Sequence, residues 1–141
     1  MTIEQDFLNA AKTGDQETFI RILNDQSIKI EPNHADEEGN TALIIAARYG
    51  HSNIVCALID DPRIDLSCAD QAKKAIIAAT KNEHDKALRL LLEFSGQRLS
   101  DDEIANLTGS DRGFYKRILT RLLWRTRFRG IVRLMIYFRR M

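Results

Sequence analysis

The sequence predicts an all-α fold, a solenoid of about three helix-turn-helix repeats followed by a basic C-terminal helical extension. Three observations predict it. One segment recurs further along the chain at a fixed offset, the apolar residues of each copy follow helical spacing, and the charge changes sign near residue 112. The 141 residues suit one domain, and 44% hydrophobic with 29% charged residues is typical of a folded chain.

The clearest copy of the repeat spans residues 36–68. At an offset of 33, its residues 42–46 (ALIIA) align with residues 75–79 (AIIAA), and His51 aligns with His84. This offset equals the period of a known class of helical repeats, so it is informative beyond the matching letters.

A weaker copy precedes it. At an offset of −36, Gly50 aligns with Gly14, and the alanine pair at 46–47 aligns with the pair at 10–11. The three extra residues fall in the connection near residues 28–35, where insertions cost little. We therefore expect repeats over about residues 3–35, 36–68 and 69–94, forming one unit over 1–94, with the extension over 95–141.

Each repeat is expected to hold two short helices that face the same way. In the second repeat Leu43, Ala46 and Ala47 follow helical spacing, as do the apolar residues between Ile54 and Ile59. Gly50 suits the left-handed turn that ends the first helix. A unit this short cannot bury its own apolar face, so neighbouring units must stack.

This pattern resembles the ankyrin repeat family over about residues 3–94, most strongly over 36–68. The T-P-L-H motif of that family keeps its Thr and Leu at Thr41 and Leu43, whereas Ala42 and Ile44 replace Pro and His. The resemblance implies that Thr41 ties down the start of the first helix. It also implies that His51 and His84 have structural roles after the turn glycine.

The resemblance further implies that the protein binds another protein and catalyses no reaction. Family members meet their targets through the hairpin tips and the concave face of the first helices. The equivalent positions here are Glu37, Glu38, Asn40, Arg48, Tyr49, Asp70, Gln71, Lys73, Lys81 and Asn82, with Lys12 and Thr13 in the first repeat. Tyr49 is the strongest single candidate, because exposed Tyr and Arg dominate interface energies. The alternative is that some of these residues only keep the surface solvated.

The extension begins with a helix start signal. Ser100 and Glu103 have the spacing of a capping box, which predicts a short helix over about 101–107. Gly109 is expected to end it, and Ser110 with Asp111 to cap the next helix, over about 114–126. The apolar stripe of that helix is Tyr115, Ile118, Leu119, Leu122 and Leu123. The apolar run at 131–138 could be a degenerate fourth repeat or a strand.

The charge distribution is strongly asymmetric. Residues 1–111 hold 11 basic against 20 acidic residues, whereas residues 112–141 hold 10 basic residues and no acid. The extension could be a cap that closes the stack, or it could bind an anionic membrane, a nucleic acid or a protein partner. Its candidate basic patch is Arg117, Arg121, Arg125, Arg127, Arg129 and Arg133.

Nothing in the sequence predicts catalysis, a cofactor or a metal site. Cys56 and Cys68 have no base at a suitable spacing and are expected to be ordinary thiols. The acidic pairs at 60–61 and 101–102 are expected to lie at helix ends or on the surface. The N-terminus is acidic, unlike a signal peptide, so a cytoplasmic protein is expected. Short ankyrin proteins of intracellular bacteria are often translocated effectors, which makes the host cytosol the alternative.

Overall fold

The computed structural model describes residues 2–64, 69–95 and 97–122. Several predictions lie outside these residues. They are those on Cys68, Leu123, Arg125, Arg127, Arg129 and Arg133, and on the apolar run at 131–138.

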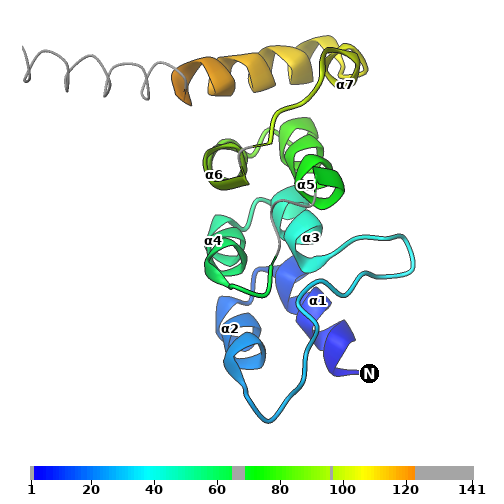
Figure 1. Cartoon of the computed structure of the whole chain (residues 1–141), viewed down its shortest axis with the longest axis vertical. Helices are drawn as coiled ribbons and strands as arrows, with labels where there is room; N and C mark the ends of the chain where they lie inside the picture. The colour runs from blue at the N-terminus through cyan, green and yellow to red at the C-terminus, as the bar shows by residue number, and fades with distance from the viewer. Residues whose placement is uncertain (1, 65–68, 96, 123–141) are drawn as a thin grey trace, which may run out of the picture.

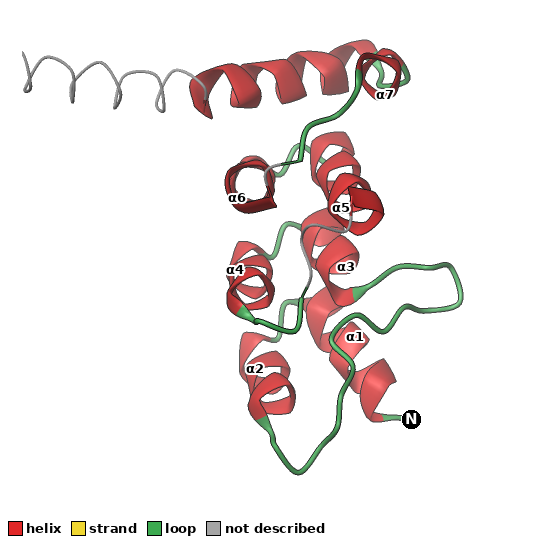
Figure 2. Cartoon of the chain, viewed as in Figure 1, coloured by secondary structure: helices red, strands yellow, loops and turns green. Residues whose placement is uncertain are grey.

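The described chain forms three helical hairpins, a short helix and a longer last helix. In order, they are α1 (Ile3–Thr13), α2 (Gln16–Asn24), α3 (Ala42–Tyr49), α4 (Ser52–Asp60), α5 (Ala69–Lys81), α6 (Asp85–Ser95), α7 (Asp101–Ala105) and a helix over 109–122. The first helices α1, α3 and α5 stack in one column, and α2, α4 and α6 stack in a second (Figure 1). Figure 2 shows helices joined by loops, and the described residues contain no strand beyond an isolated bridge between Ala35 and Thr41. The predicted all-α solenoid is confirmed.

One hydrophobic core runs through the stack. Phe7 and Phe19 stack in the first repeat with ring centroids 4.4 Å apart. Ala46 and Ala47 are fully buried in α3, and their small side chains allow neighbouring helices to approach closely. The same core includes Phe114, Tyr115, Ile118 and Leu122 of the last helix. The predicted apolar stripe therefore faces inward over its described part.

Two polar contacts join the last helix to the chain before it. The Tyr115 hydroxyl accepts a hydrogen bond of 3.0 Å from the backbone N–H of Leu99, and burial raises the pKa of Tyr115. The Arg112 guanidinium donates to the carbonyl oxygens of Ile104, Ala105 and Leu107 at 3.0 to 3.3 Å. Arg112 therefore closes the end of α7.

The start of the last helix differs from the prediction. The capping box of Ser100 and Glu103 is present, and α7 follows it. Gly109, expected to end the short helix, instead begins the last helix, and Ser110 and Asp111, expected to cap that helix, lie within it. The Thr108 carbonyl accepts from the Arg112 N–H at 2.9 Å. A glycine is costly in a helix interior, but at the first helical position its freedom costs little.

Turn glycines and histidines link successive repeats. Gly14 and Gly50 end their helices at φ 78° and 74°. A Cβ on Gly14 would lie 2.6 Å from the His51 ring, and one on Gly50 would lie 2.4 Å from the His84 ring. His51 Nε2 also bonds the Lys12 carbonyl oxygen at 2.9 Å. Each His ring packs against the turn glycine of the preceding repeat, which is a structural role of the kind expected for His51 and His84.

The role that the family resemblance implies for Thr41 is wrong here. Thr41 occupies the N-cap of α3, but its side chain makes no capping bond. Its Oγ1 is buried and has no partner among the described residues. Ile44 stands where the family motif has His and offers the hydroxyl no polar atom. The approach to α3 is held by the bridge between Ala35 and Thr41 instead.

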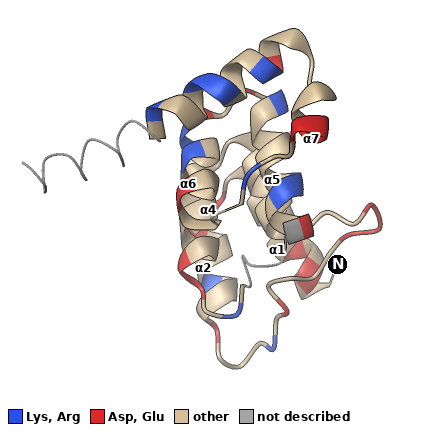
Figure 3. Ribbon diagram, turned by 45° about the horizontal axis from the view of Figure 1, so that its top comes forward, with Lys and Arg blue, Asp and Glu red and all other residues tan. Residues whose placement is uncertain are grey.

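The loop before α3 projects from the stack and is red at its end in Figure 3. We call its acidic residues Asp36, Glu37 and Glu38 the acidic tip. The Asp36 carboxylate accepts from the backbone N–H groups of Glu38 and Asn40, both at 2.9 Å. These bonds, with that of Asn40 foremost, lower the pKa of Asp36. Gly39 completes the turn at φ 79°. The tip is therefore held in shape by its own hydrogen bonds.

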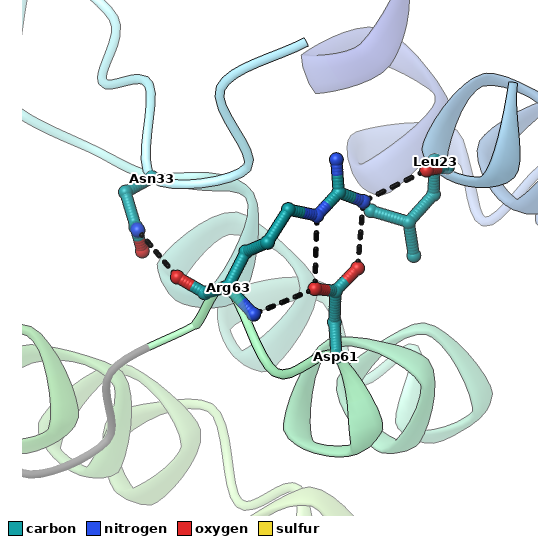
Figure 4. A network of polar contacts seen from close by, with 4 residues as sticks. All are labelled: Leu23, Asn33, Asp61 and Arg63. Carbon is teal, nitrogen blue, oxygen red and sulfur yellow. Dashed lines mark hydrogen bonds and ion pairs between the residues drawn. The ribbon is translucent and has the colours of Figure 1, made fainter. Parts of the chain in front are cut away.

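A guanidinium clamp joins the first repeat to the second (Figure 4). Arg63 follows α4, and its Nη2 donates to the Leu23 carbonyl oxygen at the end of α2 at 2.8 Å. Asp61 holds this side chain by an ion pair of 2.8 Å, and the hydrogen bond from Arg63 lowers the pKa of Asp61. Asn33 donates to the Arg63 carbonyl oxygen at 3.1 Å. The acidic pair at 60–61 thus lies at a helix end, as expected.

Candidate functional site

A hollow of about 790 Å³ opens between α1, α3 and the loop that precedes α3. Its lining combines one side of α1, the exposed side of α3 and the acidic tip. The lining residues are Thr2, Gln5, Leu8, Lys12, His34, Ala35, Asp36, Glu37, Glu38, Asn40, Ile45, Arg48 and Tyr49.

A second hollow of about 290 Å³ continues from α3 to α5. Its lining residues are Glu38, Gly39, Asn40, Ile44, Arg48, Lys74, Ile77, Ala78, Lys81 and Asn82. Glu38, Asn40 and Arg48 line both hollows, so the two hollows adjoin each other along the column of first helices. We call the two hollows together the groove.

The groove brings together most of the residues that the sequence assigned to partner binding. These are Glu37, Glu38, Asn40, Arg48, Tyr49, Lys81 and Asn82, together with Lys12 of the first repeat. Asp70, Gln71 and Lys73 line neither hollow, and Thr13 lies at the end of the stack instead. Lys73 Nζ is 3.5 Å from Glu103 Oε2, which gives this amine a partner on α7.

The floor of the groove carries one basic residue per repeat. Lys12, Arg48 and Lys81 occupy equivalent positions near the C-terminal ends of α1, α3 and α5. Arg48 Nη2 donates to Asn40 Oδ1 at 3.2 Å, which orients the guanidinium beside the acidic tip. Lys12 and Lys81 are exposed and form no ion pair within the described residues. We call these three residues the basic ladder.

Tyr49 lies at the rim and is 44% exposed. Lys12 Nζ lies 5.9 Å from the centroid of its ring, within the range of a weak cation–π contact. An exposed aromatic ring beside a cation can pack against an apolar side chain and still leave the cation free for an anion.

Several groove residues were missed by sequence reasoning. Gln5 and Lys74 are the equivalents of Thr41, and Leu8 and Ile77 are the equivalents of Ile44. The repeat offsets could have located these residues only if Thr41 and Ile44 had themselves been candidates. His34 had no such signal, because it lies in the connection that has no counterpart in the other repeats.

The last helix presents a second charged surface. Lys116, Arg117 and Arg121 are exposed on its outer side, and none forms an ion pair within the described residues. The Arg117 guanidinium lies 5.5 Å from the Phe114 ring centroid. The two predicted patch residues that the structure describes therefore face away from the core.

No arrangement typical of catalysis occurs in residues 2–64, 69–95 and 97–122. No group of three or more His, Cys, Asp or Glu side chains there could hold a metal ion. The exposed Cys56 thiol donates a weak hydrogen bond to Asp60 Oδ2 at 3.9 Å, and in this part of the chain it is bonded to no base with an orienting group of the kind that a catalytic thiol needs. Within the same residues, none of the helices combines the length and the apolar character that a membrane crossing requires.

Comparison with known proteins gives one finding. Residues 7–103 match the family model described as ankyrin repeats in three copies. No curated protein and no solved structure matches the chain.

Proposed function

Because the chain belongs to the ankyrin repeat family, we propose that it recognises another protein through the groove and catalyses no reaction. Ankyrin repeats are generally protein–protein interaction modules, and the family is typically non-catalytic. The observation that carries the proposal is the groove itself, which gathers the hairpin tip and the exposed side of three successive first helices.

Rigid-surface docking is the proposed mechanism. The acidic tip is preformed by the Asp36 hydrogen bonds, and Arg48 is already oriented by Asn40. Binding to such a surface orders few new side chains, so little conformational entropy is lost. Tyr49 supplies an exposed aromatic anchor beside these charges.

Affinity capture with quantitative mass spectrometry tests the proposal. The full chain, a Tyr49→Ala variant and an Arg48→Glu variant are used as bait in an extract of the source cells. Lys86→Glu is the matched control, because Lys86 is exposed on α6 and lines neither hollow. We expect a protein that the wild type and Lys86→Glu retain equally but that Tyr49→Ala retains about thirtyfold less, since truncating an interface Tyr that acts as a hot spot costs about 2 kcal/mol. Capture that is unaffected by both groove variants would overturn the proposal.

For the extension, we propose that residues 109–122 form a cap that covers the end of the last repeat. The buried Phe114, Tyr115, Ile118 and Leu122 support it, because they share one core with the repeats. Lys73 of α5 also pairs with Glu103 of α7, which joins the last repeat to the segment that leads into the cap.

A second candidate function is that the outer side of this helix binds an anionic membrane or a nucleic acid. The exposed and unpaired Lys116, Arg117 and Arg121 favour it. Phosphate-dominated binding weakens steeply with salt. We expect any such binding to fall with added salt and with Arg117→Glu/Arg121→Glu but not with Lys86→Glu. Binding that is unaffected by added salt and by Arg117→Glu/Arg121→Glu would exclude a membrane or nucleic-acid site on this helix.

The proposed setting is the cytosol, either of the source cell or of a host cell that a bacterial effector has entered. The Cys56 thiol is exposed and forms no disulfide within the described residues, which suits a reducing compartment.

A further inference from the structure

The basic ladder repeats at the spacing of the helix stack. Lys12, Arg48 and Lys81 come from α1, α3 and α5, which pack side by side in one column (Figure 1). Packed helices lie about 8–10 Å apart. A ligand that paired with all three cations would therefore need anions about 9 Å apart along its length.

Few peptide conformations provide that spacing. A polyproline II helix has three residues per turn and a rise of about 3.1 Å per residue, so every third side chain recurs on one face after about 9 Å. In a β-strand, side chains on one face recur after about 6.6 Å. This distance is shorter than the spacing of about 9 Å between neighbouring ladder residues, so a strand could not pair with all three cations in sequence. The spacing of the ladder therefore matches the first conformation and not the second.

The acidic tip adds a second constraint. Glu37 and Glu38 are exposed on the wall above the ladder, and the bonds to Asp36 fix the turn that carries them. A polyproline II helix has three faces about 120° apart. If the acidic side chains of the peptide lie on the face toward the ladder, one of its two other faces lies toward the acidic tip. Lys or Arg on that face of the peptide would pair with Glu37 and Glu38. Tyr49 at the rim can pack against proline rings, as aromatic residues do in other grooves that bind this conformation.

We infer that the groove binds a proline-containing segment of the partner protein in polyproline II conformation, with an acidic side chain at every third position. The carboxylates pair with Lys12, Arg48 and Lys81, and basic side chains on the next face meet Glu37 and Glu38. This inference rests on the proposed function and specifies the chemistry of the partner at that same site.

Fluorescence anisotropy with two synthetic peptides tests the inference. The first is Glu-Pro-Lys repeated four times, which places all Glu on one face and all Lys on another. The second is Glu-Glu-Pro-Lys-Lys-Pro repeated twice, which has the same composition and zero net charge but mixes both charges on two faces. Both peptides have the same net charge, so overall charge attraction to the protein is equal. A difference in affinity therefore depends on whether the Glu side chains lie on one face at the spacing of the ladder. We expect the first peptide to bind the full chain about tenfold more tightly.

Variants of the protein locate the contact. Lys12→Glu and Lys81→Glu change exposed side chains and should each weaken the first peptide by at least about two- to fivefold, the range of an exposed ion pair. Glu37→Lys/Glu38→Lys should weaken it similarly, whereas Lys86→Glu should leave it unchanged. Thermal unfolding followed by circular dichroism checks that each variant is folded, and either ladder variant alone suffices for the test.

Three results would overturn the inference: equal affinity of both peptides, equal loss with Lys86→Glu, or a loss only with Glu37→Lys/Glu38→Lys. If the peptides fail while affinity capture still depends on Tyr49, this inference fails and the proposed function stands. If capture does not depend on Tyr49, the proposed function fails as well.

Discussion

At the scale of single residues, the contact between a turn glycine and the next histidine links the repeats. Gly50 has φ 74°, and a Cβ there would meet the His84 ring at 2.4 Å. Gly39 has a similar φ of 79°, but a Cβ there would meet nothing within 4 Å. A side chain at either position would strain the backbone, but only a side chain at Gly50 would also overlap a neighbouring ring.

We expect Gly50→Ala to lower the free energy of unfolding by about 2–4 kcal/mol, of which about 1–2 kcal/mol is left-handed strain. Gly39→Ala, the matched control, should cost only about 1–2 kcal/mol. Adding His84→Ala to Gly50→Ala should cost less than the sum of the single changes, because it removes the overlap. Urea unfolding of the wild type, the three single variants and the double variant measures these costs. Equal costs at the two glycines would mean that the ring does not fill the turn.

The guanidinium clamp makes stability depend on pH. The folded-state pKa of Asp61 lies below the ordinary 3.8, with the Arg63 hydrogen bond as its main cause. A lowered pKa means that the stabilisation is fully present above the unfolded-state value and is lost as the pH falls through the folded-state value. Asp61→Asn should therefore be less stable than the wild type at pH 7. The difference should shrink as the pH falls below about 4. Urea unfolding across that range measures it, and a constant difference would contradict the account.

At the scale of elements, sequence reasoning recovered the features that depend on local spacing. The repeat offset located the hairpins of α3–α4 and α5–α6, and the spacing of Ser100 and Glu103 located the start of α7. The role of Thr41 was wrong because its buried hydroxyl makes no capping bond at the start of α3. The helix start at Gly109 was missed because the preference of glycine for helix ends does not say which end. The groove needed the structure, because the repeat pattern predicted Glu37, Glu38 and Asn40 as tip residues but did not show that they enclose a hollow with α1 and α3.

The last helix supplies a prediction at this scale. Tyr115→Phe leaves the buried Leu99 N–H without its acceptor and should cost about 1–3 kcal/mol. Ile118→Ala should cost about 2–5 kcal/mol because it opens a cavity in the shared core. Lys116→Ala, on the outer side of the same helix, should stay within about 0.5 kcal/mol.

If residues 109–122 act as a cap, both buried changes should also speed amide hydrogen exchange in α5 and α6. Exchange that rises only within 109–122 would show that this helix is separate from the cooperative unit of the repeats.

At the scale of the whole molecule, the described residues carry two separate charged surfaces. The groove combines the basic ladder with the acidic tip along the first helices, whereas Lys116, Arg117 and Arg121 are exposed on the last helix. The central claim is that the groove is the surface that meets a protein partner.

Site-specific photo-crosslinking in the source cells tests that claim most directly. A photoreactive amino acid replaces Tyr49 in the groove, Lys86 on the outer side of α6, or Arg121 on the last helix, one position per protein. The account predicts that a discrete protein adduct forms from position 49 and not from position 86 or 121. Adducts from position 86 or 121 without any from position 49 would contradict it, because the partner would then bind away from the groove.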